Sequence, residues 1–304
     1  MTRNLPALIE ADIIDAEFSE PSPRALVVTQ ADSDRHLIEL WLGRHASRHT
    51  RRNYARQADR FLAFIRKPLA EVRLGDVQAF AASLDHQAPA TRAIAVAAIK
   101  SLFAFAKDAG YLDFNVGAVV KAPPVKNTLA ERILAEPDVH RMIALEPRLR
   151  NRIILTLLYA GGLRISELCG ICWRDLSERD DAGQITVFGK GGKTRAILLS
   201  ASTWRQIETF RGEADPDAPL FVSREGGPLN ASQVHRIVKA AAIRAGLSGE
   251  VSAHWLRHAH ASHSLDRGAP IHLVQATLGH ASVATTGRYL HARPTDSSAR
   301  YLGI

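Results

Sequence analysis

The chain has 304 residues, of which 46% are hydrophobic and 23% are charged, the composition of a soluble globular protein. No apolar run approaches the roughly 18 residues of a membrane span, and no signal peptide is recognised, so we expect a cytoplasmic protein of two domains with no membrane partner. The formal net charge of +8 favours nucleic acid as a partner, because Lys and Arg gain affinity by releasing counterions from phosphates.

The N-terminal third of the chain predicts an arm followed by a helical domain. Residues 1–31 contain prolines and acidic residues without a sustained period, which predicts a flexible arm. Four short-looped helices are expected over residues 32–119. The second of them has an arginine-rich face, since Asp59 is the single acid between residues 44 and 67. We therefore expect a DNA-facing surface. Its candidate contacts are Arg48, Arg51, Arg52 and Arg56.

A Pro pair and the lack of an apolar face predict a linker over residues 120–134, before a second domain at residues 135–292. A Gly-Gly break precedes Arg164, and Glu167 follows one helical turn later, so these charges need each other or an anion. Two β-like runs, residues 184–188 and 194–199, predict a hairpin with Lys190 at its turn. A short strand at residues 220–223 and a helix from Asn230 follow. The fold class is mainly α with a small antiparallel β-sheet.

The segment from residue 251 to 291 is rich in histidine and ends near a tyrosine. His254 and Arg257 are three residues apart, so in a helix they project from one face. His280 follows a glycine, and Tyr289 comes nine residues later. A phenol has a pKa of about 10, so Tyr289 attacks only where neighbouring groups take its proton or stabilise the phenolate. The intervening His258, His260 and His263 are interpreted as structural or supporting residues.

These residue types suit phosphoryl transfer at a DNA backbone without a metal. Paired guanidinium groups match the spread negative charge of the transition state. Lys190 suits protonation of the leaving oxygen, and His254 suits activation of the attacking one. The clustered carboxylates of a two-metal nuclease are absent from the sequence. Cys169 and Cys172 are interpreted as small core residues, because no second pair completes a zinc site.

Five segments carry a family resemblance: GGLRISEL, FGKGGKTR, HWLRH, LGH and TTGRYLH, in this order. With them the chain resembles the tyrosine recombinases of the phage-integrase family, most of all the Xer-type members, over residues 32–304. The resemblance implies an N-terminal SAM-like core-binding domain and a C-terminal catalytic domain. It also implies Tyr289 as the nucleophile and Glu167 as a supporting acid. The implied catalytic set consists of Arg164, Lys190, His254, Arg257 and His280. The segment AHASH after His258 departs from the family pattern and argues against a housekeeping Xer subfamily.

The resemblance further implies a 3′-phosphotyrosyl intermediate and strand exchange between two duplexes through a Holliday junction, with no metal, ATP or other cofactor. Family members act as tetramers on two DNA sites, and a second recombinase or an accessory protein is a further candidate partner. The tail, residues 293–304, has an apolar tip that docks on another subunit or folds back on its own domain; both remain open. The alternatives are a non-catalytic DNA-binding protein on the same fold and relaxation of a single duplex, as by a type IB topoisomerase.

Overall fold

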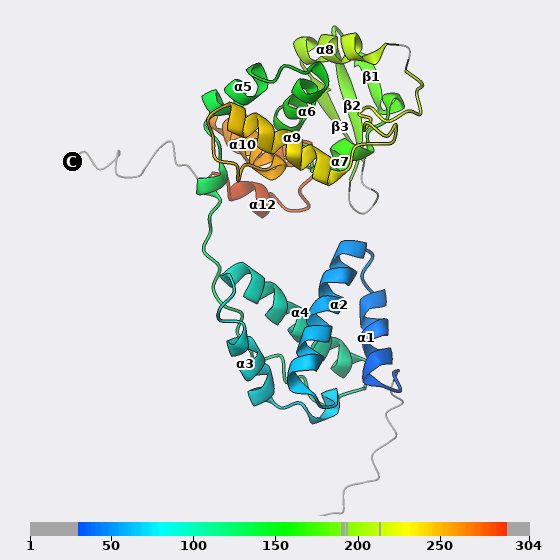
Figure 1. Cartoon of the computed structure of the whole chain (residues 1–304), viewed down its shortest axis with the longest axis vertical. Coiled ribbons are helices and arrows are strands. Elements are labelled where there is room, and N and C mark those ends of the chain that lie inside the picture. Colours follow the sequence, from blue (N-terminus) through cyan, green and yellow to red (C-terminus); the bar gives the residue numbers. More distant parts are fainter. Residues whose placement is uncertain (1–29, 190–191, 193, 213, 291–304) are drawn as a thin grey trace, which may run out of the picture. The chain divides into compact units, whose positions relative to one another are not determined.

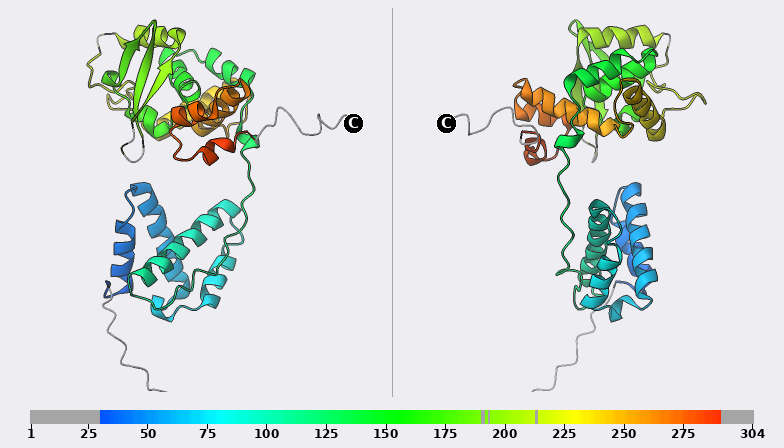
Figure 2. Two further views of the ribbon diagram at one scale, coloured as in Figure 1. Left: turned by 180° about the vertical axis from the view of Figure 1, so that it is seen from behind. Right: turned by 60° about the vertical axis from the view of Figure 1, so that its left-hand side comes forward.

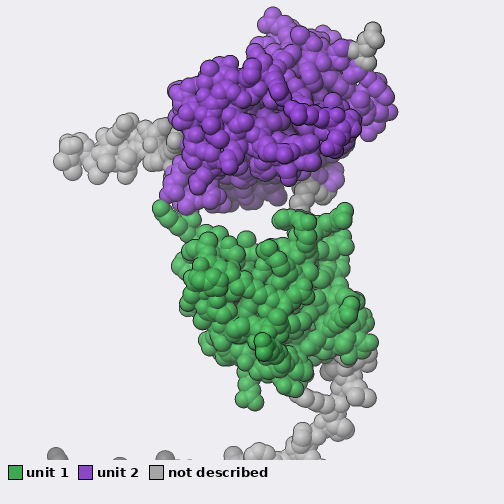
Figure 3. All heavy atoms as spheres, in the orientation of Figure 1, with its two compact units in different colours: residues 1–126 green, residues 127–304 purple. Residues whose placement is uncertain are grey.

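The computed structural model describes residues 30–189, 192, 194–212 and 214–290. The chain forms two compact units, residues 1–126 and 127–304, called here the N-terminal and the C-terminal unit (Figure 3). The described part is mainly helical with one three-stranded antiparallel sheet, which confirms the predicted fold class (Figure 1). The predicted arm and tail lie outside the described residues, apart from Gln30 and Ala31. Ala31 is 3% exposed and belongs to the core of the N-terminal unit.

Within the described residues, the N-terminal unit contains four α-helices and one short 3-10 turn (Figure 1). These are α1 (Asp34–Gly43), α2 (Arg48–Ile65), η1 (Leu69–Glu71), α3 (Leu74–Ser83) and α4 (Pro89–Asp108). Serine hydroxyls cap the first two helices, since Ser33 accepts from the backbone nitrogen of His36 and Ser47 from that of Thr50. Large aromatic side chains fill the core between the helices. They are Trp41, Phe61, Phe80 and Phe103.

Helix α4 corrects the expectation that no segment matches a membrane span in length and apolarity. By length and composition alone, Pro89–Asp108 is long and apolar enough to cross a membrane. Its buried side chains, among them Ile99, Leu102 and Phe103, line the core of the N-terminal unit. Its apolarity is therefore accounted for by packing against α1 and α2.

The C-terminal unit is built around α6, whose middle is almost wholly buried. Its described elements outside the sheet are η2 (Ala130–Arg132), α5 (Glu136–Ala144), α6 (Leu149–Tyr159), α7 (Ile165–Gly170), η3 (Trp173–Asp175), α8 (Ala201–Arg211), α9 (Ala231–Arg244), α10 (Ala253–Asp266), α11 (Ile271–Leu278) and α12 (Val283–Gly287). Helices α5, α7, α8, α9 and α10 all pack against α6 or against one another (Figure 2). The short turn η2 lies inside the segment predicted as a linker.

The sheet has the order β1-β2-β3, with strands Leu176–Arg179, Ala182–Phe188 and Thr194–Leu199. The β2–β3 hairpin was predicted, whereas β1 was not, because only Leu176 of its four residues is buried. Helix α8 covers β2 closely, and a Cβ added at Gly183 would lie 2.1 Å from the Trp204 ring.

The strand predicted over residues 220–223 is wrong. Val222 forms only an isolated bridge with Pro228. Its flanking hydrogen bonds run from the Ser223 nitrogen to the Gly227 carbonyl and from the Leu229 nitrogen to the Phe221 carbonyl, and the chain turns between them.

Candidate active site

Glu167 anchors the first part of the site by binding the arginine that precedes its helix. Arg164 is the N-cap of α7, and its backbone nitrogen donates to Glu167 Oε2 at 2.8 Å. Its side-chain Nη1 also donates to Glu167 Oε1 at 2.8 Å. A carboxylate at this place satisfies a free N–H of the helix start and favours the helix dipole. The guanidinium of Arg164 is thereby held at a fixed place beside α7.

Arg195 on β3 completes this ion pair, and the sequence analysis did not name it as a site residue. Its Nη1 and Nη2 donate to the two oxygens of Glu167 at 2.9 and 2.8 Å. Burial by itself raises the pKa of Glu167, but the hydrogen bonds from Arg195 and Arg164 outweigh it and lower the pKa to about 2. Arg195 lies on the same face of β3 as the buried Ile197 and Leu199. A charged residue on the buried face of a strand is the signal that could have found it.

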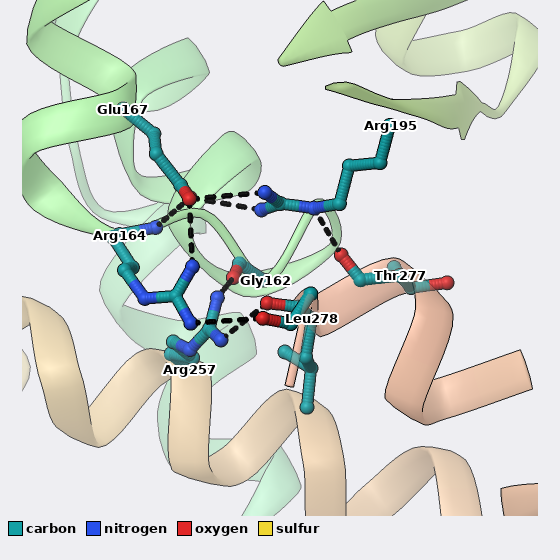
Figure 4. A network of polar contacts seen from close by, with 8 residues as sticks. Gly162, Arg164, Glu167, Arg195, Arg257, Thr277 and Leu278 are labelled. Atoms are coloured by element: carbon teal, nitrogen blue, oxygen red, sulfur yellow. Dashed lines mark hydrogen bonds and ion pairs between the residues drawn. The ribbon is translucent and has the colours of Figure 1, made fainter. Parts of the chain in front are cut away.

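The C-terminal end of α11 gathers three arginines (Figure 4). Three consecutive carbonyl oxygens there each accept from a different guanidinium: Thr277 from Arg195 Nε at 2.7 Å, Leu278 from Arg257 Nη2 at 2.6 Å, and Gly279 from Arg164 Nη2 at 3.2 Å. The last carbonyls of a helix lack partners within the helix and lie at the negative end of its dipole. They therefore offset part of the repulsion between three positive charges, of which Glu167 neutralises one.

Arg257 is the most deeply buried of the three, with 1% of its surface exposed. Its second recorded acceptor is the carbonyl of Gly162, bound through Nη1 at 2.5 Å. Burial, with the nearby charge of Arg164, lowers the pKa of Arg257 to about 10, so the guanidinium remains charged at neutral pH. Both recorded hydrogen-bond acceptors are neutral carbonyls, and a bound anion would therefore be attracted to it.

Tyr289 lies just beyond α12 and is 6% exposed. Its Oη is 2.7 Å from Nδ1 of His258 on α10. Burial, with smaller contributions from His254 and Arg132, lowers the pKa of His258 to about 3. Burial also raises the pKa of Tyr289, against the opposing charges of Arg257 and Arg288. The phenol therefore stays protonated and donates to a neutral imidazole.

Burial raises the pKa of the Tyr289 phenol and lowers that of the His258 imidazole, and both shifts argue against His258 as the base that ionises Tyr289 in this arrangement. The phenol pKa lies above its ordinary value of about 10, and the imidazole pKa is about 3. His258 was predicted to have a structural or supporting role, and its direct contact with Tyr289 was not expected from the motif.

The two predicted catalytic histidines lie on either side of this pair. The His254 ring meets the His258 ring edge to face, with centroids 4.2 Å apart. The His280 ring stacks parallel to Tyr289 at 6.4 Å, and its Nδ1 is 2.9 Å from Thr286 Oγ1. Burial, followed by the charge of Arg257, lowers the pKa of both histidines, to about 4 for His280. At neutral pH His280 is therefore uncharged.

Residues 132–296 match the Phage integrase family, and residues 34–110 match the family's N-terminal SAM-like domain. The tyrosine recombinase XerC of Myxococcus xanthus is 37% identical over 227 residues, 68% of this chain and 73% of the relative. That of Mesorhizobium japonicum is 31% identical over 283 residues, 86% and 90% of the two chains. The chain belongs to the phage integrase family. It is a tyrosine recombinase of the Xer type.

Solved structures agree with this fold. A XerH site-specific recombinase in a post-cleavage complex with its palindromic difH substrate has a TM-score of 0.73 at 21% identity, covering 90% of this chain and 85% of that one. A lambda integrase tetramer bound to a Holliday junction has a TM-score of 0.70 at 19% identity, covering 86% and 77%. At these identities the likeness shows the fold alone.

A pocket of about 850 Å³ opens beside the arginines of this recombinase. Its lining includes Arg164, Arg195 and His280. Gly189 and Thr194, at the two ends of the β2–β3 connection, also line it. Lys190, the predicted proton donor, belongs to that connection and lies outside the described residues. Because Arg164 and His280 both line this pocket, an anion bound in it would meet both side chains.

The predicted DNA contacts of the recombinase lie on α2 of the N-terminal unit. Arg48, Arg51, Arg52 and Arg56 are all exposed there. Arg56 donates to Asn53 Oδ1 at 3.4 Å, and within the described part of the chain no side-chain partner is recorded for the other three. The opposite face of α2 buries Ala58 and Phe61 in the core, so the exposed face is available to an anionic partner.

Proposed function

We propose that the chain cleaves and rejoins duplex DNA through Tyr289. In this proposal the Tyr289 oxygen attacks a backbone phosphorus, a 3′-phosphotyrosyl bond forms, and the 5′ oxygen leaves as a hydroxyl group. That hydroxyl then attacks the phosphotyrosyl phosphorus on a second duplex and displaces the tyrosine oxygen, which regains its proton, so the strands are exchanged through a Holliday junction. The energy of the phosphodiester is kept in the phosphotyrosyl bond, so no step needs ATP.

The observation that carries the proposal is the cluster of Arg164 and Arg257 at the end of α11, next to His280 and Tyr289. Two guanidinium groups match the equatorial oxygens of a phosphoryl-transfer transition state. Arg257 is assigned to transition-state charge because its recorded partners are carbonyls. Arg164 shares that role while Glu167 holds it in place.

The proposed cleavage step also requires that Tyr289 lose a proton and that the leaving 5′ oxygen gain one. Tyr289 loses its phenol proton as the oxygen–phosphorus bond forms, and His254 is assigned to assist this loss. Lys190 is assigned to protonate the leaving 5′ oxygen. His280 stacks against Tyr289 and binds Thr286, so it is assigned to hold the phosphate and the tyrosine in register.

The partners follow from the same proposal. We propose a cytoplasmic enzyme that acts as a tetramer on two DNA sites, with the exposed arginines of α2 contacting the duplex. The lambda integrase neighbour is a tetramer on a Holliday junction, which supports this assembly. A second recombinase or an accessory protein is an additional partner to be sought.

Trapping of covalent adducts on nicked suicide duplexes tests the proposal. A library of such duplexes is incubated with the wild-type chain and with Tyr289→Phe, and adducts are detected on denaturing gels. The wild type should form an adduct, and the variant should bind DNA equally well without forming one. Loss of DNA binding in the variant would contradict the role given to Tyr289. Supercoil relaxation without recombinants would select the topoisomerase alternative, and no adduct with any duplex would select the non-catalytic one.

A further inference from the structure

A second pocket, of about 630 Å³, lies in the C-terminal unit away from the tyrosine. It is lined by the turn between α5 and α6, by the loop before α9 and by one face of α9. Arg150, in the first turn of α6, borders this pocket, whereas Gly162 of the candidate active site follows the other end of the helix. Eleven residues of α-helix span about 16 Å, so the two sites are separate.

The charges around this pocket do not balance. Its lining includes five arginines and two glutamates: Arg148, Arg150, Arg224, Arg236, Arg244, Glu146 and Glu225. The buried Glu146 pairs with Arg244 at 2.9 Å. Arg150 is engaged by Asn151 and by the carbonyl of Val222. These interactions build the wall of the pocket and leave the other three arginines and Glu225.

Arg148, Arg224 and Arg236 are exposed, and no side-chain partner is recorded for them among the residues that the structure describes. Burial, followed by the charges of Arg148 and Arg224, lowers the pKa of Arg150. The guanidinium groups of Arg148 and Arg224 therefore lie close enough to that of Arg150 to repel it, and Arg236 lines the same pocket. A bound anion would relieve this repulsion, and the planar donors of arginine fit the oxygens of a phosphate best.

We propose that Arg148, Arg224 and Arg236 bind a backbone phosphate of duplex DNA that is not the phosphate being cleaved. The proposal rests on the proposed function, because it takes DNA as the substrate. A separation of about 16 Å corresponds to roughly five base-pair steps of 3.4 Å. A duplex is therefore long enough to span the distance from the candidate active site to this pocket. Its contribution would be affinity and register on the DNA, without any part in the chemical step.

The salt dependence of DNA binding tests this pocket. The triple variant Arg148→Gln, Arg224→Gln, Arg236→Gln is compared with the wild type on a labelled 30-base-pair duplex of mixed sequence. Affinity should fall roughly tenfold at moderate salt. The slope of log affinity against log salt should become shallower by about one for each phosphate that the variant no longer binds. Arg205→Gln, on the exposed face of α8 and outside the pocket, should leave both quantities unchanged.

Each result of these binding measurements either supports or overturns the proposed phosphate site. The three single variants, each with its melting temperature, separate weaker phosphate binding from impaired folding. An equal effect of Arg205→Gln would overturn the proposal, because removal of any positive charge would then suffice. An unchanged slope in the folded triple variant would also overturn it. Binding of inorganic pyrophosphate that is abolished in the triple variant, with DNA binding intact, would assign the pocket to a free phosphorylated molecule instead.

Failure of the proposed function gives a different result. A wild-type chain that binds no duplex at all would overturn both proposals. A wild type that binds DNA through this pocket and forms no adduct would support the pocket and contradict the role of Tyr289.

Discussion

Tyr289 and His258 share a hydrogen bond of 2.7 Å in the interior of the C-terminal unit. The phenol is the donor, because burial keeps the imidazole neutral and the phenol protonated. The proposed nucleophile is thus held in its unreactive form in this arrangement. His258 positions Tyr289, and the proton must be removed by a different route before attack.

Replacement of His258 by alanine should lower the pKa of Tyr289. The hydrogen bond stabilises the protonated phenol by about 1 kcal/mol, and its removal corresponds to somewhat less than one pKa unit. Ultraviolet difference titration against a matching Tyr289→Phe background isolates this tyrosine among five. The exposed His86→Ala, in the N-terminal unit, is the matched control and should shift nothing. An unchanged phenol pKa in His258→Ala would show that the hydrogen bond does not stabilise the protonated form.

Stability should decline between pH 7 and pH 5 because of His258. Its pKa is about 3 in the folded chain and about 6.5 when unfolded, so the unfolded state binds more protons as the pH falls. The stabilisation is complete above about pH 6.5 and is lost progressively below it. One such histidine contributes about 2 kcal/mol over this interval.

Urea unfolding at the two pH values measures this contribution in the wild type and in His258→Gln. The variant should show a weaker pH dependence by about 2 kcal/mol. Glu167 does not contribute to the change in unfolding free energy between pH 7 and pH 5. Its pKa is about 2 in the folded chain and 4.5 when unfolded, so its effect on stability falls at pH values below 4.5. An identical pH dependence in both chains would mean that His258 is not neutralised by burial.

Arg195→Lys should slow cleavage more than it weakens DNA binding. Lysine keeps the charge but cannot donate two parallel hydrogen bonds to the oxygens of Glu167 as the guanidinium does. Arg164 would then be positioned less firmly, and we expect single-turnover cleavage to fall roughly tenfold to a hundredfold with the dissociation constant changed less than threefold. Arg195→Met should also lower the free energy of unfolding by about 3 kcal/mol, since it leaves a buried carboxylate with one partner fewer. Equal losses of binding and cleavage in Arg195→Lys would argue for a general structural defect.

The fold class and several features of the site followed from local patterns in the sequence. Helical spacing put His254 and Arg257 on one helix, and both lie on α10. The spacing of Arg164 and Glu167 predicted that they need each other, and they form an ion pair at 2.8 Å. These relationships lie within one turn of a helix, so periodicity is enough to reveal them.

Other features depend on tertiary contacts and on backbone groups. Arg195 reaches Glu167 from a strand 28 residues away in the sequence. The carbonyls that receive the three arginines carry no signature in residue identity, because every residue has one. The contact between His258 and Tyr289 joins two helical regions whose approach is set by packing. The polar strand β1 was missed for a related reason, since its partner β2 supplies most of the buried side chains.

Gly162→Ala should destabilise the chain and impair cleavage together. Gly162 has φ +57, and a Cβ there would lie 2.7 Å from Leu278 and 3.0 Å from His260. Gly246, with φ +74 and nothing within 4 Å, is the matched control, and its alanine variant should lose only about 1 kcal/mol for the backbone strain. Gly162→Ala should lose about 2 kcal/mol more through overpacking, measured by urea unfolding. Its carbonyl accepts from Arg257, so displacement of this turn also moves the buried guanidinium. A variant as stable and as active as Gly246→Ala would show that the turn tolerates a side chain and does not position Arg257.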